Sequence, residues 1–137
     1  MPCREHAAQL CERQDEFSRL NTRVVIISFA TLPALQKWMD EICGSFDVLL
    51  DPNREVYTSY QLERSRLRSW HPKVIWIYIK RWFQGGSFYD SHGDDASQLG
   101  GDFIIDKHGI LKLVYPSHDP TDRPPVDDLL AVIEDLQ

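Results

Sequence analysis

The stretch QLGGDFIIDKHGILKLVY, residues 98–115, decides the fold class because it predicts a β-hairpin in the last third of the chain. Residues favourable to strands, apolar except for Lys112, occupy 103–105 and 110–115, and Gly109 between them supplies the positive φ that a tight hairpin turn requires. Upstream, the β-branched run VVIISF at 24–29 is typical of a parallel strand buried on both faces. Strands of these two kinds predict a mixed α/β domain.

Helical patterns surround these strands. Apolar side chains spaced three or four residues apart predict one continuous amphipathic helix at the start of the chain and further helices downstream. The predicted helices cover 3–20, 31–46, 54–62 and the segment after Pro124-Pro125, with a short strand at 48–50. The run VIWIYI at 74–79 fits either a strand or a helix, and its periodicity does not decide between them.

Composition limits the classes of protein to which the chain can belong. It has 137 residues, 42% hydrophobic and 26% charged, which fits one soluble domain covering 1–137. A net charge of −6 without a basic run disfavours nucleic acid as a partner. No basic-then-apolar signal peptide opens the chain, and no apolar run reaches the roughly 18 residues of a membrane helix. We therefore expect a cytoplasmic protein without stable membrane insertion.

The three cysteines do not form a disulfide scaffold. Cys3 and Cys11 are eight residues apart on one predicted helix, about 12 Å along its axis, which is too far for a disulfide. Cys11 falls on the apolar stripe and is interpreted as a small core residue. Cys43, near the end of the second helix, is interpreted as structural or incidental.

Four segments in this order resemble a known family. They are PCREHAAQL (2–10), DPNREVY (51–57), QLGGDFIID (98–106) and DPTDRPP (119–125). Together they are similar to the peroxiredoxin-like proteins of the alkyl hydroperoxide reductase and thiol-specific antioxidant (AhpC/TSA) family, in the thioredoxin-like superfamily. The resemblance implies a thioredoxin-like three-layer sandwich with an aromatic insert at about 64–98, before the C-terminal hairpin and helix.

The chain departs from that family at its start. The family's first helix opens with Cys-x-x-Cys after an apolar core strand, whereas here Cys3 matches the second cysteine and both the first cysteine and the strand are missing. Two explanations stay open: the chain begins at an internal methionine of a longer protein, which we prefer, or its sheet closes in an unusual way. Gly100-Gly101 stands where thioredoxins have a cis-proline, and this fits the peroxiredoxin-like branch.

Cys3 is the residue best placed for chemistry. A cysteine in the first turn of a helix meets unpaired N–H groups and the positive end of the helix dipole, which favour a thiolate. Arg4 adds positive charge, and His6, one turn on, is placed to accept a proton or bind the sulfur. The resemblance implies that Gly100 and Gly101 line the opposite wall of the site. The alternative is that Cys3 is an ordinary terminal thiol.

The function predicted from these residues is that of a thiol-dependent oxidoreductase or peroxidase, an antioxidant protein with a redox-active cysteine. Its substrate would be a small peroxide or disulfide, its reductant a thiol or a thioredoxin-like partner, and no cofactor or metal is implied. The alternative is a non-catalytic binding module that has lost the dithiol. The aromatic insert is interpreted first as packing on the sheet, then as a homodimer surface, and as a membrane-surface contact only as a further possibility.

Overall fold

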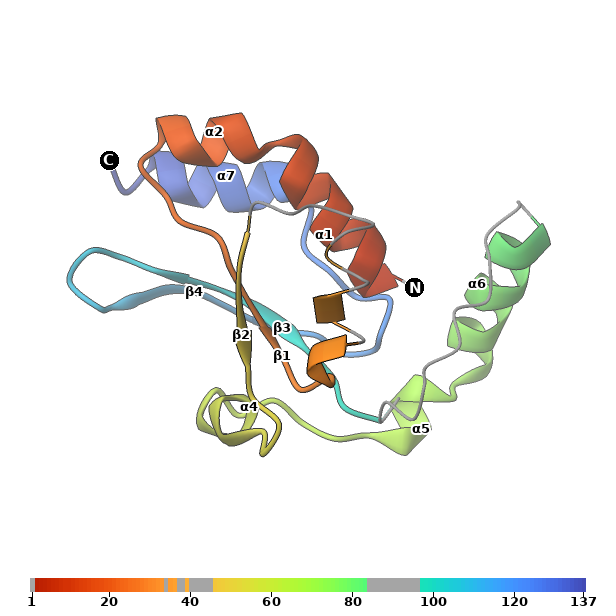
Figure 1. Ribbon diagram of the computed structural model, residues 1–137. Coiled ribbons are helices and arrows are strands. Elements are labelled where there is room, and N and C mark those ends of the chain that lie inside the picture. The colour runs from red at the N-terminus through yellow and green to blue at the C-terminus, as the bar shows by residue number, and fades with distance from the viewer. Residues whose placement is uncertain (1, 34, 37–38, 40–45, 84–96) are drawn as a thin grey trace.

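The computed structural model describes residues 2–33, 35–36, 39, 46–83 and 97–137. The helices are α1 (Pro2–Glu12), α2 (Gln14–Arg19), α4 (Glu55–Ser59), α5 (Arg66–Ser69), α6 (Pro72–Phe83) and α7 (Val126–Glu134). The strands are β1 (Val25–Ser28), β2 (Asp47–Leu50), β3 (Gly101–Ile105) and β4 (Leu111–Pro116). This mixed α/β arrangement is compatible with a thioredoxin-like fold (Figure 1).

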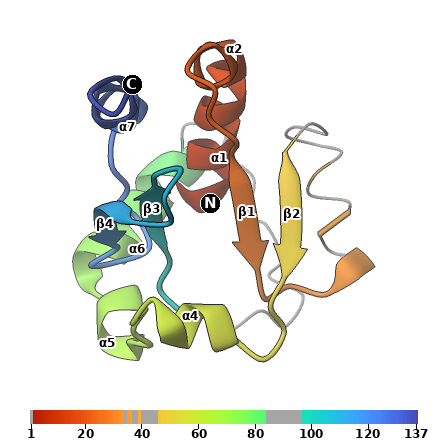
Figure 2. The ribbon, with the colours of Figure 1, turned by 90° about the vertical axis from the view of Figure 1, so that its left-hand side faces the viewer.

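The strands form two separate pairs. β1 and β2 run parallel, with Val25 opposite Asp47, and β3 and β4 form an antiparallel hairpin in which Phe103 faces Val114. Seen from the side, the two pairs stand next to each other (Figure 2). The start of α1 reaches β3, where His6 Nε2 lies 3.0 Å from Asp102 Oδ1.

The hairpin confirms the prediction made from residues 98–115. Gly109 has a φ of 80°, and the backbone N–H groups of His108 and Ile110 donate to the Asp106 carboxylate at 2.8 and 2.9 Å. The hydrogen bond from the Ile110 N–H lowers the pKa of Asp106. Partial burial opposes this effect, but the pKa stays below its ordinary value. Glycine and aspartate thus define this turn through backbone geometry and side-chain hydrogen bonds.

The core joins the two ends of the chain. Phe17 of α2 packs with Val126, Leu130 and Ile133 of α7, and all four side chains are buried. In Figure 1 these two helices lie side by side above the strands. The pairing anchors the C-terminal helix against the N-terminal segment.

The predicted helix over 3–20 is broken into α1 and α2 at Arg13. The Arg13 side chain pairs with Glu16 and donates to Asp127 Oδ1 at 2.7 Å, so it links the break to the start of α7. The interpretation of Cys11 as a free core residue is wrong, because Cys11 is half-buried and disulfide-bonded. Cys43 and much of the predicted helix 31–46 lie outside the described residues.

One open alternative is decided and one expectation changes. The run at 74–79 is helical, within α6. β1 is not buried on both faces, since Val25 is 43% exposed. None of the described helices has the length and apolar character needed to cross a membrane.

Asp51 holds the turn that leads from β2 into α4. Its carboxylate is buried and accepts hydrogen bonds from the backbone N–H groups of Glu55 and Val56, both at 2.9 Å, and of Tyr57 at 3.3 Å. The Tyr57 hydroxyl in turn donates to the Ile27 carbonyl at 3.0 Å, which ties α4 to β1. One carboxylate therefore satisfies the free N–H groups at the start of this short helix.

We expect Asp51→Ala to lower the free energy of unfolding by about 1–3 kcal/mol, because it leaves buried N–H groups without acceptors. Urea denaturation followed by circular dichroism measures this change. Asp51→Asn, which keeps one acceptor oxygen, should lose less. Equal stability of Asp51→Ala and the wild type would contradict the role given to this carboxylate.

Candidate functional site

Cys3 lies in the first turn of α1, and its side chain is exposed. It is a free thiol, and the guanidinium in contact with it comes from the other end of the chain: Arg123 Nη2 is 3.1 Å from Cys3 Sγ. Arg123 belongs to the segment between β4 and α7, which also contains the buried Pro124. The sulfur therefore meets a cation fixed by tertiary structure as well as the helix N-terminus.

Asp102 on β3 holds this cation in place. Its Oδ2 accepts from Arg123 Nη1 at 3.0 Å, and its Oδ1 lies 3.0 Å from Nε2 of the buried His6. Because a carboxylate only accepts, His6 must donate here. The four side chains form a chain of contacts, Cys3–Arg123–Asp102–His6, which starts and ends on α1.

The charges in this cluster stabilise one another. Burial alone would raise the pKa of Asp102, but the hydrogen bond from His6 and the charge of Arg123 outweigh it and hold the pKa below its ordinary value. Burial alone would lower the pKa of Arg123, but the negative charges of Cys3 and Asp102 raise it. Arg123 is only 16% exposed and Asp102 15%, so solvent screens their ion pair weakly.

Tyr57 borders the same cluster from α4. Burial, followed by the negative charge of Cys3, raises its pKa to about 12. Tyr57 is therefore neutral near pH 7, where its hydroxyl donates to the Ile27 carbonyl. Tyr57 therefore adds an uncharged side chain beside the cluster.

The two glycines expected to line the site have different surroundings. A Cβ on Gly100 would lie 2.5 Å from Arg123 Nη2, so this glycine leaves the space that the guanidinium occupies. A Cβ on Gly101 would instead lie 2.8 Å from the backbone oxygen of Tyr115. Gly100 therefore leaves room for the Arg123 guanidinium, and Gly101 allows the two strands of the hairpin to pack closely.

We expect Gly100→Ala to slow alkylation of Cys3 about fivefold, the effect of weakening one charge-assisted hydrogen bond by about 1 kcal/mol, with little change in Tm. The guanidinium is the far end of a flexible side chain, so it can shift without disturbing the backbone. Gly101→Ala is the matched control, since its clash with backbone should lower Tm instead. A Gly100→Ala protein with wild-type alkylation would contradict this reading.

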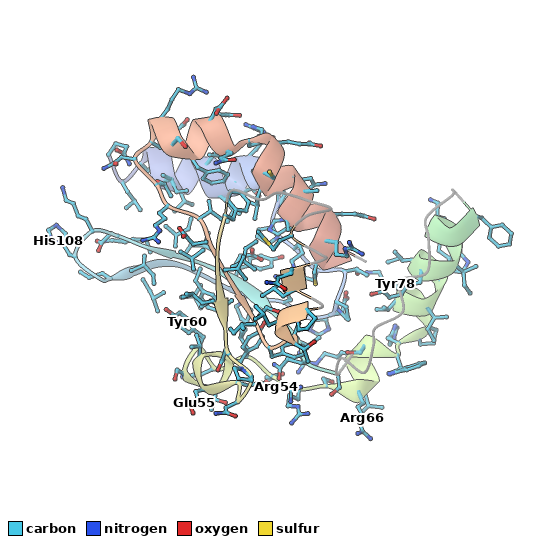
Figure 3. The ribbon with its side chains drawn as sticks, viewed as in Figure 1. Arg54, Glu55, Tyr60, Arg66, Tyr78 and His108 are labelled. Carbon is cyan, nitrogen blue, oxygen red and sulfur yellow. The ribbon has the colours of Figure 1, made fainter. Side chains whose placement is uncertain are left out.

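Arg4, the remaining residue predicted for the site, and the hairpin histidine lie in different places. Arg4 follows Cys3 on α1 and is half-buried. His108 lies at the tip of the hairpin, apart from the start of α1 (Figure 3). Within the described part of the chain, no three His, Cys, Asp or Glu side chains are grouped so as to hold a metal ion. The acidic and histidine side chains of Asp90, His92, Asp94 and Asp95 lie outside the described residues.

The sequence analysis named Cys3 and His6, which the structure brings into one chain of contacts, but it did not name Arg123 or Asp102. Both missed residues fall inside motifs singled out above, QLGGDFIID and DPTDRPP. The available signal was a charged residue embedded in each motif. The contact between Arg123 and Cys3 joins residues 120 positions apart in the sequence, so only the fold reveals it.

Comparison with known proteins agrees with the resemblance. Residues 9–120 match the family described as AhpC/TSA antioxidant enzyme. The match includes Asp102 and Tyr57 and leaves Cys3, His6 and Arg123 outside it. A search of curated proteins found no match. Since the matched segment covers well over half of the chain, the protein belongs to the AhpC/TSA family of the thioredoxin-like superfamily.

Proposed function

We propose that this protein is a thiol-dependent peroxidase in which Cys3 is the reacting thiol. The observation that carries the proposal is the contact of 3.1 Å between Arg123 Nη2 and Cys3 Sγ. A hydrogen bond from a guanidinium is stronger when the acceptor is charged, so this contact favours the thiolate over the thiol. The thiolate is the nucleophilic form of cysteine.

The reaction requires only the thiolate, a peroxide and a thiol reductant. The Cys3 thiolate attacks the terminal oxygen of a hydroperoxide, the O–O bond breaks, and an alkoxide leaves that takes a proton from solvent. Cys3 becomes a sulfenic acid. One reductant thiol condenses with it, releasing water and forming a mixed disulfide, and a second thiol releases Cys3 and a disulfide product. Family membership supports a peroxide as oxidant and a thioredoxin-like protein as reductant.

Arg123 has two roles in this scheme. Before the reaction its Nη2 donates to the sulfur, and during the attack its N–H groups face the negative charge that moves from sulfur to the peroxide oxygen. Asp102 and His6 act through Arg123 as positioning residues, because they touch the guanidinium or its partner rather than the sulfur. Arg4 would add positive charge on the same helix turn.

The proposal includes a thioredoxin-like sheet without a strand between β1 and β3. β1 pairs with β2 and β3 pairs with β4, and no hydrogen-bonded pairing joins the two pairs within the described residues. The start of α1 contacts the second pair, through His6 and Asp102 of β3. This contact supports the placement of Cys3 beside β3.

The test is the chemistry of Cys3 in the purified full chain. We expect the wild type to alkylate with iodoacetamide at pH 6 at least tenfold faster than a free-cysteine peptide, and to trap dimedone after peroxide treatment. Cys3→Ser should abolish both signals. Alkylation of Cys3 no faster than that of the peptide would disprove the activated thiol and leave the non-catalytic binding module.

A further inference from the structure

Helix α6 turns an apolar face outward. Of its described side chains Val74 is buried at 1% exposure, whereas Ile75, Trp76 and Ile79 are 41%, 63% and 42% exposed. Figure 1 shows α5 and α6 extending away from the strands and from α7. The expectation that this aromatic segment packs on the sheet is therefore wrong for Trp76, and also for Trp70, which is 66% exposed.

The outward residues form one continuous arc of the helix. At about 100° per residue, Ile75, Ile79 and Trp76 fall within about 100° of the helix circumference. Lys80 and Lys73 follow within about the next 60°, on the edge of that arc beyond Trp76. We call these five side chains the α6 surface. An apolar stripe bordered by lysines is typical of a helix that lies at a membrane interface.

Lys80 also contacts its aromatic neighbour. Its Nζ lies 5.8 Å from the centre of the Trp76 ring, and both side chains are exposed. A lysine whose stem follows an apolar surface keeps its charged end toward water or toward lipid headgroups. Tryptophan is favoured at the level of the lipid headgroups, because its ring system is largely apolar and its N–H donates a hydrogen bond to polar groups there.

Charge separates this region from the rest of the protein. Residues 64–83 contain six Lys or Arg and no Asp or Glu, a formal charge of +6. The remaining nine basic and 21 acidic residues give the rest of the chain −12. Figure 3 shows Arg66 on α5 and Tyr78 on α6 apart from the β3–β4 hairpin. The positive charge therefore accompanies the exposed apolar arc and should attract an anionic surface.

We propose that the α6 surface binds reversibly to the surface of a bilayer containing anionic phospholipid. The apolar arc would enter the boundary between headgroups and acyl chains, and Lys73 and Lys80 would lie among the phosphates and carboxylates. A single-stranded nucleic acid would use flat rings in a basic groove, whereas here two isoleucines extend the apolar surface on a convex helix. The proposal does not depend on the chemistry of Cys3.

The experiment is co-sedimentation of the full chain with vesicles of phosphatidylcholine alone or with 30% phosphatidylserine. We expect binding only to the anionic vesicles, a blue shift of tryptophan emission on binding, and release at high salt. Lys73→Gln/Lys80→Gln should bind about 25-fold more weakly, about fivefold for each charge removed. Trp76→Ala should lose about tenfold.

Matched controls come from β2 and from the β3–β4 hairpin. Lys107→Gln/Lys112→Gln removes two hairpin lysines, and Leu49→Ala removes an exposed apolar residue of β2; both should bind like the wild type. Circular dichroism shows whether each variant is folded. Failure to bind anionic vesicles, or equal loss in the control variants, overturns the proposal. So does tighter binding to a single-stranded oligonucleotide, or a dimer that Trp76→Ala dissociates.

Discussion

Replacing Arg123 with Gln is expected to slow the alkylation of Cys3 at pH 6 by about 10- to 100-fold, since a hydrogen bond to a charged group contributes about 1.5–3 kcal/mol. The reaction with peroxide should fall by about 100-fold or more, because it also loses a donor that faces developing negative charge. Gln keeps a polar side chain near the sulfur but has no positive charge. The measurement is the second-order rate constant of each reaction for wild type and variant.

A matched variant separates the local charge from the net charge. Arg23→Gln removes one positive charge from an exposed pair with Asp47 near the start of β1 and should leave both rate constants unchanged. Arg123→Lys keeps the charge but cannot contact Cys3 and Asp102 with two forked N–H groups, so it should recover only part of the rate. Wild-type reactivity in Arg123→Gln would show that the helix N-terminus alone activates Cys3.

The parts of the fold that could be predicted depend on local chemistry. The hairpin followed from Gly109 and two apolar runs, and α7 followed from Pro124-Pro125 and its apolar stripe, because backbone φ and helix periodicity are properties of neighbouring residues. The break at Arg13 could not be predicted in this way. It is accompanied by a contact with Asp127, more than a hundred residues away.

In the site, too, local features could be predicted and long-range contacts could not. Cys3 was predicted because the start of a helix is a local feature with a known effect on thiols. Arg123 could not be assigned, since its importance depends on the tertiary structure that brings it to the sulfur and on the small Gly100 that leaves it space. The residues of the proposed site that the sequence analysis did not name are those whose partners lie far away in the sequence.

Asp102 is expected to be the residue of the site that contributes most to stability. Asp102→Ala leaves the Arg123 charge largely buried without its carboxylate and removes the acceptor of the buried His6, so the free energy of unfolding at pH 7 should fall by about 3–5 kcal/mol. Asp47→Ala breaks an exposed ion pair with Arg23 and serves as the control, with little expected change. Urea denaturation at fixed temperature gives both values.

The pH dependence identifies the charge of Asp102 as the cause. Its pKa is lower in the folded chain than the unfolded value of about 3.9, so the unfolded state binds more protons between the two values and stability rises with pH across that interval. The contribution is complete above about pH 5 and is lost as the pH falls through the folded pKa. The stability difference between wild type and Asp102→Asn should therefore shrink below pH 4. A difference that stays constant from pH 7 to pH 3 would mean that shape and hydrogen bonding, rather than charge, make Asp102 important.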